Sequence, residues 1–208
     1  MLFPSLPPQP TDYIETMYYG RGYRKIAGVD EAGRGPLAGP VVAGAVILSK
    51  DGIGQKLFDS KKISSKKREE LYGVILAKAL GVGIGIIGQE EIDFLNIFQA
   101  TLKAMALAVE NLPLPPDFIL IDGPHGFNFP VPQKPIRKGD QLSNSIAAAS
   151  IVAKVTRDRI MMECHQKYPQ YNFAKHKGYG TEEHRRAIEK FGVCELHRKT
   201  FSGVKEYL

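Results

Sequence analysis

The apolar positions of this 208-residue chain follow two periods that alternate along the sequence. Short apolar runs rich in β-branched residues are typical of buried strands, and they occur at 25–32 (KIAGVDEA), 40–48 (PVVAGAVIL), 81–87 (GVGIGII) and 117–122 (DFILID). Apolar residues at helical spacing predict helices near 14–18 and over 64–80, 89–112, 141–168 and 182–191. Strands that alternate with helices favour an α/β fold, here followed by a helical C-terminal extension.

Composition narrows the class of protein. Hydrophobic residues make up 43% of the chain, but no apolar run approaches the ~18 residues of a membrane-spanning helix. The first ten residues, MLFPSLPPQP, lack the basic and apolar regions of a secretory signal. The two cysteines, Cys164 and Cys194, form no CxxC motif. We therefore expect a cytoplasmic protein with no membrane association and two reduced thiols.

Positive charge is concentrated in the last third of the chain. Residues 134–208 hold 15 Lys and Arg against 8 Asp and Glu, a net charge of +7, whereas residues 1–133 hold 13 against 14, a net charge of −1. A basic segment beside a near-neutral body fits a polyanionic partner such as nucleic acid. An ordinary solvated surface would carry the same bias, so the charge alone leaves both interpretations open.

Four acidic residues stand where strands end or a helix begins. Asp30 and Glu31 end one strand, Asp122 ends another, and Asp140 comes directly before a helix. Strand ends converge at one edge of an α/β sheet, and carboxylates clustered there are costly to desolvate unless a cation such as Mg²⁺ or Mn²⁺ neutralises them. Asp140 could instead cap its helix, and Asp122 could stabilise the turn that follows it. The adjacent pair can serve one site only if the strand bends or ends there, because successive strand side chains point to opposite faces.

A glycine-rich loop, GRGPLAG, follows the acidic pair. A dinucleotide-binding GxGxxG turn would need glycine at position 38, which is Ala38, and a helix after the loop. A phosphate-binding P-loop would need a lysine after Gly39, and none is there. Gly33 and Gly35 carry no Cβ, so the backbone could approach a ligand closely, and Arg34 suits an anion. A tight turn between two strands would need the same glycines, so both interpretations stay open.

These residues belong to longer motifs that resemble the bacterial ribonuclease HII family. DEAGRGPLAGPVVA is similar to the signature of that family. Further matches follow in the same order along the chain: DSKKIS (59–64), ILIDG (119–123), KGD (138–140), SIAAASIVAKVTRD (145–158), HKGYGT (176–181) and HRKTFSGVK (197–205). The resemblance covers residues 25 to 205 and departs at Phe58, where the family often has asparagine. The ribonuclease HIII pattern fits less well.

The resemblance implies a ribonuclease H-like fold, a mixed five-stranded sheet flanked by helices. It suggests a partly ordered N-terminal extension (1–20), a catalytic domain (21–168) and a C-terminal substrate-binding extension (169–208). It implies that two Mg²⁺ or Mn²⁺ ions are bound by four acids: Asp30, Glu31, Asp122 and Asp140. Two metals ~4 Å apart can hold an attacking water and a leaving 3′ oxygen in line, so cleavage would leave 3′-hydroxyl and 5′-phosphate ends. By the same resemblance Asp30 touches both metals, Asp140 lies on the water side, and Glu31 and Asp122 lie on the leaving-group side.

The resemblance also implies a substrate. Gly33, Arg34 and Gly35 are similar to the family motif that reads the 2′-hydroxyl, the group that distinguishes RNA from DNA. Tyr179 matches a substrate-sensing tyrosine that packs against a deoxyribose on the 3′ side. The implied enzyme cuts the RNA of RNA–DNA hybrids and cuts 5′ of single ribonucleotides embedded in duplex DNA, as in ribonucleotide excision repair. We expect a monomer with no evident protein partner.

Other basic and aromatic residues have simpler explanations. Four lysines are candidates for phosphate contacts: Lys61, Lys62, Lys154 and Lys177. The basic run 66–68 favours a solvated helix face instead. Tyr168, Tyr171 and Phe173 favour packing in the core or in loops over base stacking, whereas His176 and His184 could lie at the surface, with no metal role.

Two other function classes remain open. A non-catalytic, basic nucleic-acid-binding module would show metal-independent binding, but a cluster of four acids would not favour phosphate. A Rossmann-type oxidoreductase would retain nicotinamide, but the glycine spacing and the missing helix argue against it.

Overall fold

A mixed five-stranded sheet forms the centre of the molecule. The computed structural model describes residues 10–57, 60 and 63–208. In sheet order β3-β2-β1-β4-β5, the strands are β1 (Ile26–Ala32), β2 (Val41–Ile47), β3 (Gly81–Ile87), β4 (Phe118–Asp122) and β5 (Gln133–Ile136). β1 pairs antiparallel with β2, and β2 with β3, whereas β4 and β5 run parallel to β1. The sheet implied by the resemblance is confirmed. The edge strand β5 (QKPI) has no apolar run that predicts it, and its proline is tolerated because it lies at an edge.

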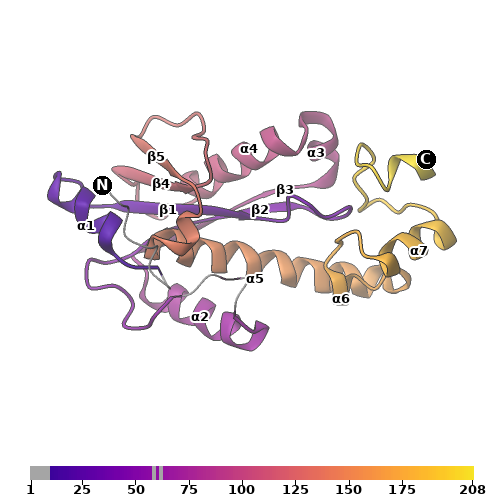
Figure 1. Ribbon diagram of the computed structural model, residues 1–208, viewed down its shortest axis with the longest axis horizontal. Coiled ribbons are helices and arrows are strands. Elements are labelled where there is room, and N and C mark those ends of the chain that lie inside the picture. The colour runs from indigo at the N-terminus through magenta and orange to yellow at the C-terminus, as the bar shows by residue number, and fades with distance from the viewer. Residues whose placement is uncertain (1–9, 58–59, 61–62) are drawn as a thin grey trace, which may run out of the picture.

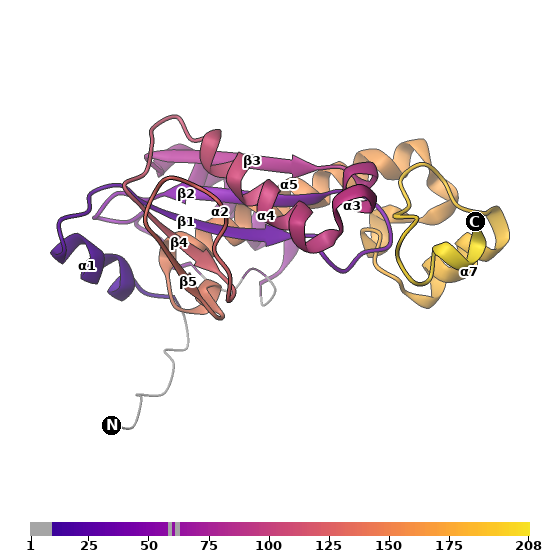
Figure 2. The same cartoon turned by 90° about the horizontal axis from the view of Figure 1, so that it is seen from above.

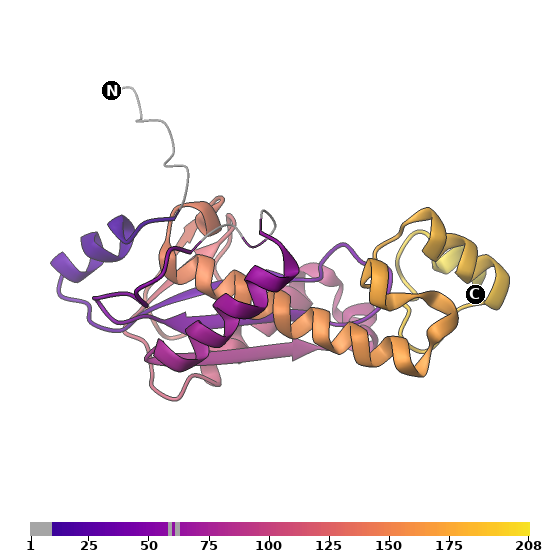
Figure 3. The same cartoon turned by 90° about the horizontal axis from the view of Figure 1, so that it is seen from below.

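Helices cover both faces of this sheet. Within the described residues they are α1 (Tyr13–Gly20), α2 (Ser65–Lys78), α3 (Gln89–Leu95), α4 (Ile97–Glu110), α5 (Asn144–Lys167), α6 (Phe173–His176) and α7 (Glu182–Phe191). Figure 1 shows the sheet nearly edge-on, with α3 and α4 on one side and α2 and α5 on the other. Seen from below in Figure 3, α5 runs along the sheet toward the C-terminal segment, which lies beyond the sheet's end. No helix in the described part of the chain is both long and apolar enough to cross a bilayer.

Glycines in the strands let the helices rest directly on the sheet. A Cβ at Gly28 would come 2.1 Å from the backbone of Ser145 in α5, and one at Gly44 would come 2.6 Å from the Ala149 carbonyl. The glycines at positions 83 and 85 meet α4 in the same way, at 2.0 Å. This explains the glycine spacing of GVGIGII, because only glycine leaves room for a helix backbone at that distance. The start of α5 is thereby pressed against β1, close to Asp30.

The single helix expected over residues 89–112 is wrong, because the structure has two helices there. Asn96 separates α3 from α4 with φ 72°. Its side chain accepts hydrogen bonds from the N–H groups of Phe98 at 3.0 Å and Gln99 at 3.1 Å, and so caps α4. Asparagine tolerates this backbone conformation and is a favoured N-cap. Apolar spacing continues across the break, so periodicity alone missed it.

The C-terminal segment builds a small core of its own at the end of α5. Its buried members are Leu37, Ala38, Met161, Tyr171, Phe173, Ile188 and Val204, and Tyr168 packs against them while partly exposed. The expected packing role of the three aromatic residues is therefore confirmed. Asp93 of α3 ties this segment to the sheet domain, because its carboxylate accepts from the N–H groups of Lys199 at 2.7 Å and Thr200 at 2.9 Å. Figure 2 shows β1 and β3 pointing toward this segment, so it stands beside the edge where the acidic strand ends lie.

Candidate active site

Two of the predicted acids lie side by side at the ends of neighbouring parallel strands. The register pairs Val29 of β1 with Ile121 of β4, so Asp30 and Asp122 are the next residues along each strand. Both lie on the face covered by α5, because Gly28, two residues before Asp30, packs against that helix. Asp30 is only 3% exposed. The convergence expected from the sequence is therefore observed for this pair.

Asp140 lies on a short turn that contacts Asp122. The turn η1 (Gly139–Gln141) precedes α5, whose N-cap is Ser143 and not Asp140. The Gly139 N–H donates to Asp122 Oδ1 at 2.7 Å. Asp140 itself is 3% exposed. The helix-cap alternative for Asp140 is therefore wrong, and the turn places this buried acid next to the end of β4.

Asp122 does not stabilise the turn that follows it. Its hydrogen bond with Gly139 spans 17 residues. A local side-chain turn would need an N–H two residues later, and that residue is Pro124, which has none. The side chain thus links β4 to the segment before α5.

Asp30 occupies an environment that favours a cation. Burial raises the pKa of Asp30 well above its usual value, and the carboxylates of Glu31 and Asp122 raise it further, while the Ser150 hydroxyl and the Glu31 N–H oppose the shift. Oδ1 accepts from the Glu31 N–H at 2.7 Å, whereas Oδ2 is buried and has no hydrogen-bond partner among the residues that the structure describes. Two neighbouring carboxylates repel the ionised form of Asp30, and a hard cation bound among these oxygens would relieve that repulsion.

The carboxylates of Glu31 and Asp122 nevertheless form hydrogen bonds with different groups. In the described residues, no three Asp, Glu, His or Cys side chains are grouped so that they could hold a metal ion. Glu31 Oε1 accepts from Arg34 at 3.3 Å, and Asp122 Oδ1 accepts from Gly139. Carboxylate oxygens are the ligand type that Mg²⁺ or Mn²⁺ prefers, but the side chains of the described residues do not converge on one point. The assignment of Asp30, Glu31, Asp122 and Asp140 as ligands therefore stays a prediction.

A groove of about 440 Å³ opens beside this edge. Its described lining comprises Glu31, Ala32, Gly33, Arg34, Gly35, Ser60, Arg68, Ser150, Lys154 and Tyr179. The structure thus brings the glycine loop, one acid, Lys154 and Tyr179 into one depression. Lys177 lines an adjacent hollow of about 180 Å³, which shares Arg68 with the groove. The predicted phosphate contacts Lys61 and Lys62 lie outside the described residues.

The glycine loop joins two antiparallel strands, so no helix N-terminus follows it and a Rossmann-type site is excluded. Gly33 has φ +96°, and a Cβ there would lie 2.0 Å from Arg157 Nε. At Gly35 the only group within 4 Å of such a Cβ in the described residues is Tyr179 Cε1, at 3.8 Å. The backbone at Gly35 and the ring of Tyr179 therefore form two walls of the same part of the groove.

Two buried arginines, which the sequence analysis did not single out, hold this loop by its carbonyl groups. Arg157 donates to the carbonyl oxygens of Pro40 at 2.9 Å, Ala38 at 3.1 Å and Lys177 at 3.0 Å. Arg198 donates to those of Gly33 at 2.6 Å, Arg34 at 2.9 Å and Gly39 at 3.0 Å. Both side chains are fully buried. Five carbonyls between residues 33 and 40 are thus fixed by the two guanidinium groups, which preorganises the loop.

A signal for one of these arginines exists in the sequence. Arg157 follows Ala153 by one helical turn, on the face that packs against the glycines of the sheet. A charged residue on such a small-residue face must find polar partners when it is buried. Arg198 has no comparable pattern, because it lies in a loop.

The solvated helix face expected for residues 66–68 is wrong for Arg68. Its side chain donates to the carbonyls of Ser60 at 2.8 Å and Ile63 at 3.0 Å, and lies 3.8 Å from Asp158. It is partly buried between the groove and the adjacent hollow. Arg68 therefore links Ser60 and Ile63 to Asp158 of α5.

Three histidines pack behind Tyr179, so the surface position considered for His176 and His184 is wrong. His184 Nδ1 lies 2.9 Å from the Tyr179 carbonyl, which only accepts, so this nitrogen carries the proton. His184 Nε2 must then accept from His197 Nε2 at 3.1 Å, and His197 Nδ1 accepts from the Cys194 N–H at 2.9 Å. His176 stacks on His184 at 4.5 Å. The hydrogen bonds are complete only when His184 and His197 are both neutral.

Acid should therefore unfold the protein through these imidazoles. Burial is the main factor that lowers the pKa of His184 and of His197 from 6.5 to about 4. The unfolded chain then binds more protons than the folded one between these values, so stability is full above pH 6.5 and falls as the pH drops toward 4. We expect a loss of about 3 kcal/mol for each imidazole over that window. Urea denaturation between pH 7 and pH 4 measures it, with His125→Gln as a control on an exposed loop. Equal pH dependence in a His184→Gln/His197→Gln double variant would contradict the assignment.

Comparisons with known proteins show the family of this chain. The family model described as Ribonuclease HII matches residues 27–204. The chain belongs to the ribonuclease HII family. Ribonuclease HII of Syntrophus aciditrophicus is 57% identical over 91% of this chain and 90% of that protein. Ribonuclease HII of Geobacter metallireducens is 56% identical over 94% of this chain and 92% of that protein.

Solved structures confirm the fold. The crystal structure of ribonuclease H2 from Pyrococcus horikoshii OT3 superposes with a TM-score of 0.75 at 25% identity, and covers 88% of this chain and 96% of that one. As a ribonuclease HII, this protein is a metal-dependent endoribonuclease of the ribonuclease H type. The resemblance stated from the motifs is therefore confirmed for the family, the fold and the enzyme class.

Proposed function

We propose that this ribonuclease HII hydrolyses the RNA strand of RNA–DNA hybrids and cuts 5′ of single ribonucleotides embedded in duplex DNA. One observation carries the proposal: Gly35 and Tyr179 face each other across a groove that Glu31 lines, beside the buried Asp30. A backbone without a side chain can approach a ribose closely, and the 2′-hydroxyl is the group that separates RNA from DNA. The tyrosine ring offers a flat apolar surface for the next sugar.

The donor set at the sheet edge supports divalent metal. Asp30, Glu31, Asp122 and Asp140 would hold Mg²⁺ or Mn²⁺, and two ions are expected by family resemblance. When bound, the metal supplies a nucleophilic hydroxide and stabilises the leaving 3′ oxygen. The chain's own part is to fix four acids on two strand ends and one turn, and to keep Asp30 and Asp140 away from bulk water.

The loop and the C-terminal segment supply recognition in this proposal. Gly33, Arg34 and Gly35 read the 2′-hydroxyl, and the buried Arg198 fixes the carbonyls of Gly33 and Arg34. Residues 169–208 form the substrate-binding extension, and Lys154 and Lys177 contact backbone phosphates. We further propose that the enzyme acts as a cytoplasmic monomer in ribonucleotide excision repair.

The experiment uses an end-labelled DNA duplex that carries one ribonucleotide, resolved on a sequencing gel with Mg²⁺ or Mn²⁺. We expect a single cut on the 5′ side of the ribonucleotide that disappears with a chelator. A parallel lane with an RNA–DNA hybrid tests the second substrate. Duplex binding without a cut under either metal would refute the proposal and favour the non-catalytic binding module.

Replacing Lys177 with alanine should weaken binding to duplexes of any sequence. Its ammonium group bonds to the Ala174 carbonyl and lies 3.4 Å from Met162 Sδ, and among the described residues no carboxylate forms an ion pair with it. A lysine without a carboxylate partner can contact a phosphate without breaking an existing ion pair. We expect the slope of log Kd against log salt concentration to fall by ~1. The control is Lys175→Ala, because Lys175 is exposed and paired with Glu183 at 2.8 Å; an equal slope change in both variants would contradict a specific role.

A further inference from the structure

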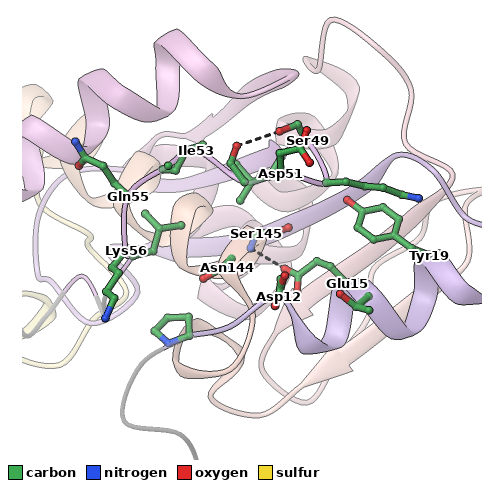
Figure 4. Close-up of a pocket in the computed structure, with 17 residues that line it drawn as sticks. Asp12, Glu15, Tyr19, Ser49, Asp51, Ile53, Gln55, Lys56, Asn144 and Ser145 are labelled. Atoms are coloured by element: carbon green, nitrogen blue, oxygen red, sulfur yellow. Dashed lines mark hydrogen bonds between the residues drawn. The ribbon is translucent and has the colours of Figure 1, made fainter.

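The N-terminal helix α1 lies outside the region that the family model matches, yet it contacts the catalytic half of the molecule. Figure 4 shows a cavity between α1, the start of α5 and the loop after β2. Its volume is about 340 Å³. Glu15 of α1 points from one wall of this cavity toward Ser145 and is 3% exposed. A carboxylate is rarely buried to this degree unless it has specific polar partners.

Glu15 caps the N-terminus of α5 from outside the helix. Its Oε1 accepts from Ser143 Oγ at 2.6 Å and from the Ser145 N–H at 2.8 Å, and the second of these bonds is drawn in Figure 4. Ser143 Oγ also accepts from the Ile146 N–H at 3.2 Å. A negative charge at a helix N-terminus is stabilised by the free N–H groups and the helix dipole.

The backbone of Thr11, just before α1, also bonds to the residues at the start of α5. The Thr11 N–H donates to the Leu142 carbonyl at 3.3 Å, and the Asn144 N–H donates to the Thr11 carbonyl at 3.0 Å. Residues 142–145 are therefore fixed by two backbone bonds and by the Glu15 carboxylate. This segment begins two residues after Asp140.

The turn that carries Asp140 has one anchor on each side. On one side Gly139 donates to Asp122 Oδ1 at 2.7 Å. On the other side the N–H groups of Leu142 and Ser143 both donate to the Gly139 carbonyl at 2.9 Å, and Ser143 is the residue that Glu15 holds. The position of Asp140 relative to Asp122 thus depends on where Ser143 is fixed.

We propose that Glu15 is a positioning residue for Asp140: the N-terminal helix fixes the start of α5 and thereby sets the carboxylate that completes the metal site. The inference rests on the proposed role of Asp140 as a metal ligand. It assigns a catalytic purpose to residues 10–20, which precede the region that the family model matches. Glutamine at position 15 keeps an oxygen that can accept from both Ser143 and Ser145, whereas alanine removes it.

The test measures Mn²⁺ dependence in the full-length protein. Glu15→Ala should raise the Mn²⁺ concentration for half-maximal cleavage by ~10-fold or more, as loss of a residue that orients a metal ligand does. Mn²⁺ affinity measured by titration without substrate should fall in parallel, with little change in KM for the duplex. Glu15→Gln should restore both values to near wild type. Tyr13→Ala is the control, because Tyr13 is on the same helix and 68% exposed.

The outcomes separate this inference from the proposed function. A Glu15→Ala variant that melts at a lower temperature but keeps wild-type Mn²⁺ dependence while folded would mean that Glu15 only stabilises α5, and would overturn the inference. If the alanine variant does not fold, Glu15→Asp replaces it: the shorter acid keeps the charge but not the reach, and an unchanged Mn²⁺ dependence would again overturn the inference. If wild type and Asp140→Asn bind Mn²⁺ equally well, the metal role of Asp140 itself fails, whatever Glu15 does.

Discussion

Asp30→Asn is expected to abolish cleavage while duplex binding persists. Asparagine keeps the shape of the side chain and an oxygen for the Glu31 N–H, which now bonds at 2.7 Å, but it removes the charge from the buried, unpartnered Oδ2. A neutral amide is a poor ligand for a hard cation. Metal binding would therefore be weakened at Asp30, the buried acid that the carboxylates of Glu31 and Asp122 both affect. We expect the cleavage rate to fall at least ~10³-fold under saturating Mg²⁺ or Mn²⁺.

The same substitution should stabilise the metal-free protein. Burial and two neighbouring carboxylates raise the pKa of Asp30, which means that its ionised form destabilises the fold at any pH above that pKa. Asparagine removes the repulsion, and we expect a higher free energy of unfolding at pH values above the pKa of Asp30. The gain should shrink as the pH falls and the wild-type carboxyl becomes protonated. Urea denaturation in the presence of a chelator measures it.

The control for Asp30 is Asp51→Asn, a change at an exposed loop acid away from the groove. It should leave both cleavage and stability at wild-type values. Cleavage by Asp30→Asn within ~10-fold of wild type would show that the reaction does not depend on this carboxylate. If Asp30→Asn is less stable than wild type without metal, the Asp30 carboxylate stabilises the fold, contrary to the expected repulsion. Opposite effects on rate and stability are the expected signature of a functional site.

Strands β1 to β4 and the principal helices could be predicted because their patterns are local. A buried strand such as 40–48 is a continuous apolar run, and a helix such as 182–191 has apolar residues at fixed spacing. The break at Asn96 was missed because the apolar spacing continues on both sides of it. β5 was missed because this four-residue edge strand, QKPI, contains a proline and has no apolar run to detect.

The candidate site was predictable to the extent that its residues lie in contiguous motifs. Asp30, Gly33 and Gly35 lie within seven residues of one another, and the register of β1 and β4 then brings in Asp122. The supports of the site come from remote parts of the chain. Glu15 bonds to Ser143 across 128 residues, and Arg198 bonds to Gly33 across 165 residues. Such pairs have no local signature, because only the folded topology places them together.

Arg198→Lys is expected to be the most destabilising conservative change in the loop supports. The guanidinium spans three carbonyls, those of Gly33, Arg34 and Gly39, within 3.0 Å. An ammonium group on a flexible stem cannot reproduce this fork, and it leaves at least two buried carbonyls without donors. We expect a loss of about 3–5 kcal/mol in the free energy of unfolding, measured by urea denaturation.

Cleavage by Arg198→Lys should also lose selectivity at temperatures where the variant is folded. Gly33 and Arg34 are the residues proposed to read the 2′-hydroxyl, and their carbonyls are the ones released. The relevant measurement is the ratio of cleavage at one embedded ribonucleotide to cleavage of a long hybrid, because a uniformly less stable enzyme would lower both equally. Arg186→Lys is the matched control, since Arg186 is exposed and pairs with Glu182 on the surface of α7.

If the ratio of the two cleavage rates is unchanged in Arg198→Lys, other hydrogen bonds fix the geometry of the loop. The candidates are the backbone bonds from Leu37 N–H to the Gly178 carbonyl at 2.8 Å and from Gly39 N–H to the Leu196 carbonyl at 2.9 Å. These bonds hold only the far end of the loop, whereas Arg198 also holds Gly33 and Arg34 at the end that faces the groove. A fall in the ratio would therefore mean that recognition depends on fixing the loop at Gly33 and Arg34, and that a buried arginine from the C-terminal segment prepares the glycine loop before substrate arrives.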